Sequence, residues 1–323
     1  ISPYYIYNMK YTNPNKLLHL FKKLSVWEKV FYAFLLVIAA TIVVNWAYEP
    51  AEGFANDDSS NKKLVVKTGN GIYDDFYSNV YDKLVFCKVK NDFEIGAIMK
   101  QTNPNKNSKI LDIGSGTGHH VDAFASNGIN AVGIDVSPSM VAKSKSTYPD
   151  NNYTVGNAME TLLFPQGSFT HITCLYFTIY YIEDKRTFLK NCYDWLAPGG
   201  FLALHLVDRD KFDPILPAGD PFSIISPQRY AKKRITSTVV KFKGYDYRSN
   251  FEYNPKKDEA SLNEQFKRTD TGDVRKNEHR LFMPTQKTVL SMAKDAGFIL
   301  HSQTDMMRCQ YATQYIYILE KPN

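Results

Sequence analysis

Short apolar runs of strand length alternate with helix-like segments through the middle of the chain. The runs KILDI, AVGID and FLALHLV are followed by polar or glycine-containing turns. KILDI leads into HHVDAFASN, which is expected to close at Gly128, and AVGID leads into a helix with Ser137 as N-cap and Pro138 at its first position. This alternation predicts an α/β domain with a largely parallel sheet.

The pattern changes from residue 232 to residue 283. Strand-like alternation dominates there, with a turn at residues 270–273. The block lies after the fifth predicted strand, so it is expected to be a β-rich antiparallel insertion. The helix TQKTVLSMAKDAGF is expected to end at Gly297, and the runs ILHSQTDM and QYIYILEK are expected to form a closing hairpin.

The first fifty residues differ from the rest. The segment from Val30 to Ala47 has eighteen residues without a charge, and aromatic residues lie near both ends. It predicts a single-pass transmembrane helix within residues 1–50, a polar linker over 51–68 and a large folded domain over 69–323. Lysines before the span favour an N-terminus inside, whereas cysteines that are expected to stay reduced favour the opposite side, so the side stays open.

Composition narrows the class of protein. The chain is 44% hydrophobic and 22% charged with a net charge of +6, which is ordinary globular usage and too weak a basic excess to predict nucleic-acid binding. Four cysteines are far apart and lack metal-ligand spacing, so no metal site is expected. They are Cys87, Cys174, Cys192 and Cys309.

The turn after KILDI is the most informative motif. Gly114, Gly116 and Gly118 follow the strand that carries Asp112. A dinucleotide fingerprint would place its third glycine at the position of His119. An acid at the end of the strand would repel a pyrophosphate but suits the α-ammonium of a methionine group. Asp135, at the end of the next strand, can accept ribose hydroxyls from either kind of cofactor.

These motifs resemble the class I S-adenosylmethionine-dependent methyltransferases of the small-molecule and ubiquinone-biosynthesis type. The resemblance rests on ILDIGSGTG, GIDVSPSM, GNAMETLLFPQGSFTHITC and NCYDWLAPGGFLALHLV. It implies a seven-stranded Rossmann-like sheet with helices on both faces, and S-adenosyl-L-methionine as cofactor. The cofactor-binding residues it implies are Tyr81, Asp112, Gly114, Ser115, Gly116, Gly118, Asp135, Val136, Met140, Asn157, Ala158, Met159 and Leu175.

The chain departs from the family pattern in the third and fourth motifs. Asn157 stands where an Asp is usual, and its amide oxygen can still accept a hydrogen bond from adenine. His171 replaces another usual Asp. Tyr180 and Tyr181 replace a usual His-His pair that faces the methyl group in relatives. These changes leave acceptor specificity open.

The expected reaction is methyl transfer to a nitrogen or oxygen of a small molecule or a membrane-associated acceptor. Resemblance makes the 232–283 insertion a cover over the substrate pocket, where His205, His279, Tyr180 and Tyr181 are the candidate catalytic residues. The alternatives are an inactive S-adenosylmethionine-binding protein and a membrane-anchored interaction protein with the same fold.

Overall fold

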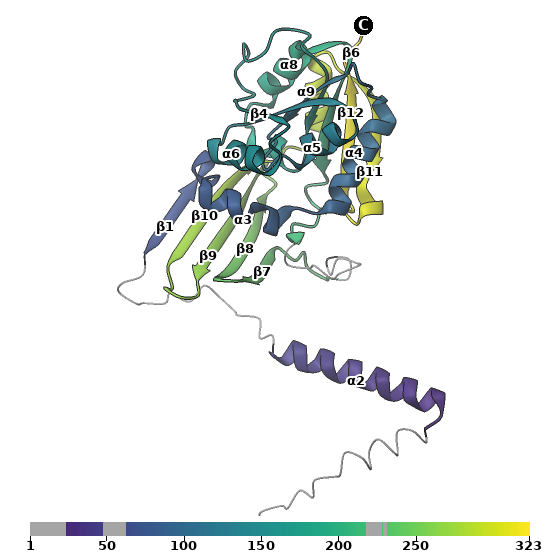
Figure 1. The fold of residues 1–323 in the computed structure, drawn as a ribbon, viewed down its shortest axis with the longest axis vertical. Helices are drawn as coiled ribbons and strands as arrows, with labels where there is room; N and C mark the ends of the chain where they lie inside the picture. Colours follow the sequence, from purple (N-terminus) through teal and green to yellow (C-terminus); the bar gives the residue numbers. More distant parts are fainter. Residues whose placement is uncertain (1–23, 48–62, 218–227, 229–230) are drawn as a thin grey trace, which may run out of the picture. The chain divides into compact units, whose positions relative to one another are not determined.

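The computed structural model describes residues 24–47, 63–217, 228 and 231–323. The chain divides into two compact units, residues 1–60 and 61–323. In the first unit, the helix α2 spans Val26–Ala47 and contains the predicted membrane segment (Figure 1). Among the residues that the structure describes, however, no helix is long and apolar enough to cross a membrane, so the predicted transmembrane helix is not supported.

A seven-stranded sheet forms the centre of the second unit, in the order β11-β12-β6-β5-β2-β3-β4. The strands from β2 to β6 are parallel, whereas β12 runs antiparallel to both β6 and β11. The predicted sheet and the closing hairpin are therefore confirmed. The strands are β2 (Lys109–Ile113), β3 (Asn130–Asp135), β4 (Asn152–Val155), β5 (Phe169–Cys174), β6 (Leu196–Val207), β11 (Ile299–Asp305) and β12 (Gln314–Glu320).

Helices cover both faces of this sheet. One face packs against α4 (Lys88–Thr102), α5 (His119–Ser126) and α6 (Pro138–Thr147), through buried residues such as Ile98 and Phe124. The other face packs against α8 (Lys185–Trp195) and α9 (Gln286–Asp295), through Phe188, Trp195 and Val289. Burial of apolar side chains on both faces explains why the central strands read as near-continuous hydrophobic runs.

The predicted β-rich insertion is a second, five-stranded sheet with the order β1-β10-β9-β8-β7 (Figure 1). Its insertion strands are β7 (Ser237–Phe242), β8 (Tyr245–Asn254), β9 (Glu259–Arg268) and β10 (Val274–Phe282). Residues 64–68, which the sequence placed in the polar linker, instead form β1 (Leu64–Thr68), which pairs in parallel with β10. The partner strand lies about 210 residues away, beyond the reach of a local pattern.

Short helices link the strands of the second unit, and two of them lie between the two sheets. The 3₁₀ helix η1 (Gly69–Ile72) leads into α3 (Asp75–Val85), whose Tyr77 and Leu84 pack with Tyr247 and Phe266 of the second sheet. The four-residue helix α7 (Thr178–Tyr181) follows β5, and η4 (Met306–Cys309) joins β11 to β12. The second sheet is thus tied to the carboxyl ends of the parallel strands through α3 and α7.

Removing residues 1–60 should leave a soluble domain that unfolds cooperatively within about 2 °C of the full chain. The described hydrophobic core contains no residue before Ile72, and the compact second unit begins at Asn61. Calorimetric melting of both forms measures this. An insoluble or unfolded truncated chain would show that the first sixty residues belong to the core.

Candidate active site

The glycine turn after β2 is fixed by both of its neighbours in space. The backbone N–H groups of Gly114 and Ser115 donate to the carbonyl of Ile134, at 2.8 and 2.9 Å. Gly114 has a φ of +70°, and a Cβ there would lie 2.5 Å from Cγ2 of Thr178. The turn is therefore held against β3 and lies directly beneath the first residue of α7.

Asp135 closes the turn at the end of β3. Its carboxylate accepts hydrogen bonds from the N–H of Gly116 at 3.0 Å and from the N–H of Ser137 at 2.9 Å. Burial raises the pKa of this carboxyl, and the two N–H donors oppose that rise. Each oxygen retains a lone pair for a further donor, and Asp135 lines the main pocket.

Asp112 lies deeper, at 2% exposure. Its Oδ1 accepts from the hydroxyl of Thr173 at 2.6 Å, while its Oδ2 has no hydrogen-bond partner among the described residues. Burial raises the pKa of Asp112, while His120 and Thr173 act against that rise. Asp112 also lines a small cavity of about 40 Å³ beside the glycine turn. An orphaned carboxylate oxygen there suits a cationic donor such as an ammonium group.

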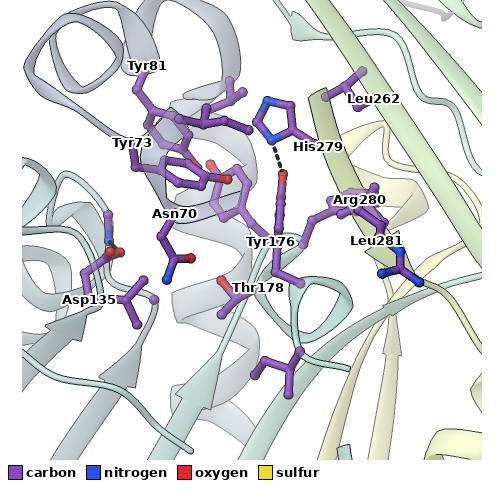
Figure 2. Close-up of a pocket in the computed structure, with 18 of the residues that line it drawn as sticks. Asn70, Tyr73, Tyr81, Asp135, Tyr176, Thr178, Leu262, His279, Arg280 and Leu281 are labelled. Atoms are coloured by element: carbon purple, nitrogen blue, oxygen red, sulfur yellow. Dashed lines mark hydrogen bonds between the residues drawn. The ribbon is translucent and has the colours of Figure 1, made fainter. Parts of the chain in front are cut away.

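The main pocket has a volume of about 700 Å³ and lies between the glycine turn and the inner face of the second sheet. In Figure 2, Asp135 lies on one side and His279 on the other, with Tyr73 and Tyr81 between them. Most of the predicted site residues line this pocket or the small cavity beside the glycine turn. Those that line one or both cavities are Tyr81, Asp112, Gly114, Ser115, Gly116, Asp135, Val136, Met140, Asn157, Ala158, Met159, Leu175, Tyr181 and His279.

Three tyrosines form one wall of this pocket, Tyr73 between η1 and α3, and Tyr77 and Tyr81 on α3. The rings of Tyr73 and Tyr77 are 5.4 Å apart and those of Tyr77 and Tyr81 are 6.0 Å apart, each edge to face. Burial raises the pKa of all three phenols, so they stay neutral near physiological pH. Their rings and hydroxyls therefore present a neutral, electron-rich wall, which suits a cation.

His279 and Tyr181 converge in the pocket, as the sequence predicted. The hydroxyl of Tyr181 lies 2.9 Å from Nδ1 of His279, and the dashed line in Figure 2 marks this hydrogen bond. Nε2 of His279 lies 2.8 Å from Oε2 of Glu264. The contacts join α7, β9 and β10 into one hydrogen-bonded chain at the pocket wall.

Two other predicted catalytic residues do not line the pocket. His205 is fully buried in β6, where its Nδ1 contacts the carbonyl oxygen of Tyr176 at 2.6 Å. Burial and the nearby Lys90 lower the pKa of His205 to about 4. The hydroxyl of Tyr180 accepts the N–H of Val207 at 2.8 Å. The predicted convergence of four residues is therefore wrong for His205 and Tyr180, which serve the core.

Two of the predicted cofactor-binding residues have other roles in the structure as well. Gly118 lines neither cavity; it begins α5 with a φ of +94° beneath Tyr153. Asn157 lines the pocket, but its Oδ1 already accepts the N–H of Met159 at 3.0 Å. An acceptor oxygen that is engaged within its own turn offers one lone pair rather than two to a ligand.

Sequence reasoning missed Glu264. The inward positions of β9 are Ala260, Glu264 and Phe266, and this carboxylate is 3% exposed among apolar neighbours. The signal was available, because period-two alternation places a charged residue on the same face as buried ones. Burying a charge on the apolar face of a strand costs free energy unless the charge is paired. Such a residue therefore indicates a buried polar site.

Residues 111–204 match the protein-family model described as a methyltransferase domain. This region runs from β2 to β6 and contains the glycine turn, Asp135 and Tyr181. The resemblance to class I S-adenosylmethionine-dependent methyltransferases is thereby confirmed.

Individual relatives agree in class but differ in substrate. The chain is 33% identical over 102 residues to a demethylmenaquinone methyltransferase of Chlorobaculum parvum, covering 31% of this chain and 42% of the relative. It is 31% identical over 111 residues to a phosphoethanolamine N-methyltransferase of Plasmodium falciparum, covering 33% and 42%. The matched region thus spans about two fifths of the length of these relatives.

A solved structure shares the fold over most of the chain. The S-adenosylmethionine-bound amino pentose methyltransferase of Micromonospora echinaspora has a TM-score of 0.54 and 18% identity, covering 76% of this chain and 96% of that one. At this identity the likeness shows the fold alone.

Proposed function

We propose that this chain transfers the methyl group of S-adenosyl-L-methionine to a nitrogen or oxygen of a small-molecule or membrane-associated acceptor. The observation that carries the proposal is the acid-flanked glycine turn, which opens directly onto a 700 Å³ pocket with a Tyr-His pair on its far wall. A cofactor site and an acceptor site are thereby contiguous, as group transfer requires.

The residues present fit the cofactor. Asp135 has lone pairs for ribose hydroxyls, and the unpartnered Oδ2 of Asp112 suits the methionine ammonium. A Cβ on Gly116 would meet nothing closer than 3.8 Å, so the backbone there is open to a ligand. Val136 and Met140 line the side where the adenine would lie.

The cofactor and the protein have different roles in the proposed reaction. S-adenosyl-L-methionine, when bound, supplies an electrophilic methyl group on a sulfonium. The protein aligns the acceptor with that methyl, excludes water and removes one proton. Tyr181 and His279 are the described pocket residues arranged to receive this proton, because they are hydrogen-bonded to each other and face the cavity.

Titration calorimetry with S-adenosylhomocysteine and with NAD tests the cofactor assignment on the full chain. We expect S-adenosylhomocysteine to bind with micromolar affinity, about −8 kcal/mol, and NAD to bind at least 100-fold more weakly. Preference for NAD, or no binding of either, would overturn the proposal.

Membrane attachment through Val30–Ala47 is a separate proposal, supported by the uncharged apolar sequence of that segment. It would raise the local concentration of a membrane-associated acceptor. Fractionation of the full chain beside the chain lacking residues 1–60 tests it. Recovery of both in the soluble fraction without any extraction step would rule attachment out.

A further inference from the structure

A buried carboxylate lies at the centre of the second sheet. Glu264 of β9 accepts the hydroxyls of Tyr77 and Tyr247 at Oε1, at 3.1 and 2.7 Å. Its Oε2 accepts the side-chain N–H of Asn277 at 2.9 Å and that of His279 at 2.8 Å. Burial opposes ionisation, yet His279 and the other donors hold the pKa of Glu264 below its ordinary value. Glu264 is therefore a fully satisfied anion.

This anion decides how His279 is protonated. An ionised carboxylate only accepts hydrogen bonds, so Nε2 of His279 carries the hydrogen in its contact with Glu264. In the neutral imidazole the other nitrogen, Nδ1, is then an acceptor, and the Tyr181 hydroxyl donates to it. With these hydrogen positions, a proton can move in one direction only, from the pocket to Tyr181 and from Tyr181 to His279.

The Tyr181 end of this hydrogen-bonded chain lies close to the glycine turn. Tyr181 is the last residue of α7, and Thr178, the first residue of the same helix, covers Gly114. The ring of Tyr181 also lies 6.1 Å from that of Tyr73, on the tyrosine wall. One short helix therefore connects the cofactor turn to the proton-accepting group.

The charges around the pocket favour an acceptor that becomes a cation on methylation. Asp135, Glu183, Asp184 and Glu264 supply carboxylates to its lining. The described cations in the lining are already paired: Lys90 bonds Glu94, and Arg280 bonds Glu259 at 2.8 Å. An acceptor that became an anion on losing its proton, such as a phenol or a carboxylic acid, would face this negative field without a free counter-charge.

Resting on the methyltransferase function proposed above, we propose that Tyr181, His279 and Glu264 form a proton relay that serves an amine acceptor, with Glu264 as its positioning residue. The neutral amine nitrogen forms a bond to the methyl carbon as the carbon–sulfur bond breaks and its electron pair goes to sulfur. The new ammonium passes a proton to the Tyr181 oxygen, whose own proton moves to Nδ1 of His279. The resulting imidazolium is stabilised by the Glu264 carboxylate.

Five polar side chains face His279 from the surrounding helices and strands. They are Glu264 on β9, Asn277 on its own strand, Tyr181 on α7, Tyr77 on α3 and Tyr73 at the end of η1. Glu264 is the one member of this set that is charged near neutral pH. Replacing Glu264 should therefore change which ring nitrogen of His279 carries the hydrogen more than any other single substitution in the set.

The first test is independent of acceptor and cofactor. In the full chain labelled with ¹⁵N-histidine, His279 is assigned by its loss in His279→Gln. We expect the hydrogen of the neutral ring on Nε2 in the wild type, and a loss of that preference in Glu264→Gln, because the glutamine amide can donate as well as accept. His171→Asn is the matched control, because His171 is a buried strand histidine that lines neither cavity. An unchanged tautomer preference in Glu264→Gln, or a wild-type ring with its hydrogen on Nδ1, would overturn the relay.

The second test uses labelled methyl transfer to ethanolamine, phosphoethanolamine and glucosamine, compared with catechol and hydroquinone. Amine turnover should fall about 10²-fold in Tyr181→Phe, His279→Gln and Glu264→Gln, and should stay within threefold in His171→Asn. Affinity for S-adenosylhomocysteine should stay within a few-fold in all of them. Methylation of the phenols alone, or of none of the five by a chain that binds the cofactor product, would overturn the amine assignment. Loss of cofactor binding in the wild type would instead refute the proposed function.

Discussion

Asp112→Asn is expected to weaken S-adenosylhomocysteine binding by about 10- to 100-fold while leaving the fold intact. The amide is isosteric and keeps a hydrogen bond to Thr173, but it loses the charge that attracts the methionine ammonium. A charge-assisted hydrogen bond contributes roughly 1.5–3 kcal/mol, which sets the size of the loss. Calorimetric titration measures it, and Asp122→Asn, a helix carboxylate outside both cavities, is the control.

The same carboxylate predicts a pH dependence. Burial raises the pKa of Asp112 above its ordinary value, so it takes up a proton at a higher pH than a free aspartate does. A protonated Asp112 no longer attracts an ammonium group. Affinity should therefore fall as pH is lowered through the raised pKa, and this fall should be absent in Asp112→Asn. An Asp112→Asn variant with wild-type affinity at every pH would refute the assignment.

Gly118→Ala is expected to cost roughly 2–4 kcal/mol of stability. Gly118 has a φ of +94°, and an added Cβ would lie 2.6 Å from the hydroxyl oxygen of Tyr153 and 2.9 Å from Cβ of Ser144. Left-handed strain and overpacking therefore act together. Thermal unfolding should show a midpoint lower by roughly 5–15 °C.

Two other glycines separate these causes. Gly128 has a φ of +75° with nothing within 4 Å of an added Cβ, so Gly128→Ala should show the backbone strain alone, about 1–2 kcal/mol. Gly116 has a φ of +55° and is open toward the pocket, so Gly116→Ala should cost binding of S-adenosylhomocysteine as well. Equal stability losses at Gly118 and Gly128 would show that the contact with Tyr153 contributes nothing.

Local sequence patterns were enough to predict much of this fold. The glycine turn, the N-cap at Ser137, the end of α5 before Gly128 and the β-rich insertion all lie where the sequence predicted them. Each depends on residues within a few positions of one another, such as the Ser137 side chain that accepts the N–H of Met140. The cofactor cavity was likewise foreseen, because Asp112 and Asp135 end adjacent parallel strands.

The acceptor side depended on the tertiary structure. From sequence, His205 and His279 were both candidates, since both stand on predicted strands. Only the packing shows that His205 is buried in the core of the first sheet while His279 faces the pocket.

The reason is that strand alternation assigns a side chain to one of two faces but cannot say what covers that face. The pairing of β1 with β10, the meeting of Tyr181 with His279 across 98 residues, and the four donors around Glu264 all join distant parts of the chain. By itself, therefore, the sequence determined the class of domain and the cofactor turn. The tertiary structure decided which buried polar groups meet in the pocket, because their partners come from separate elements that only folding brings together.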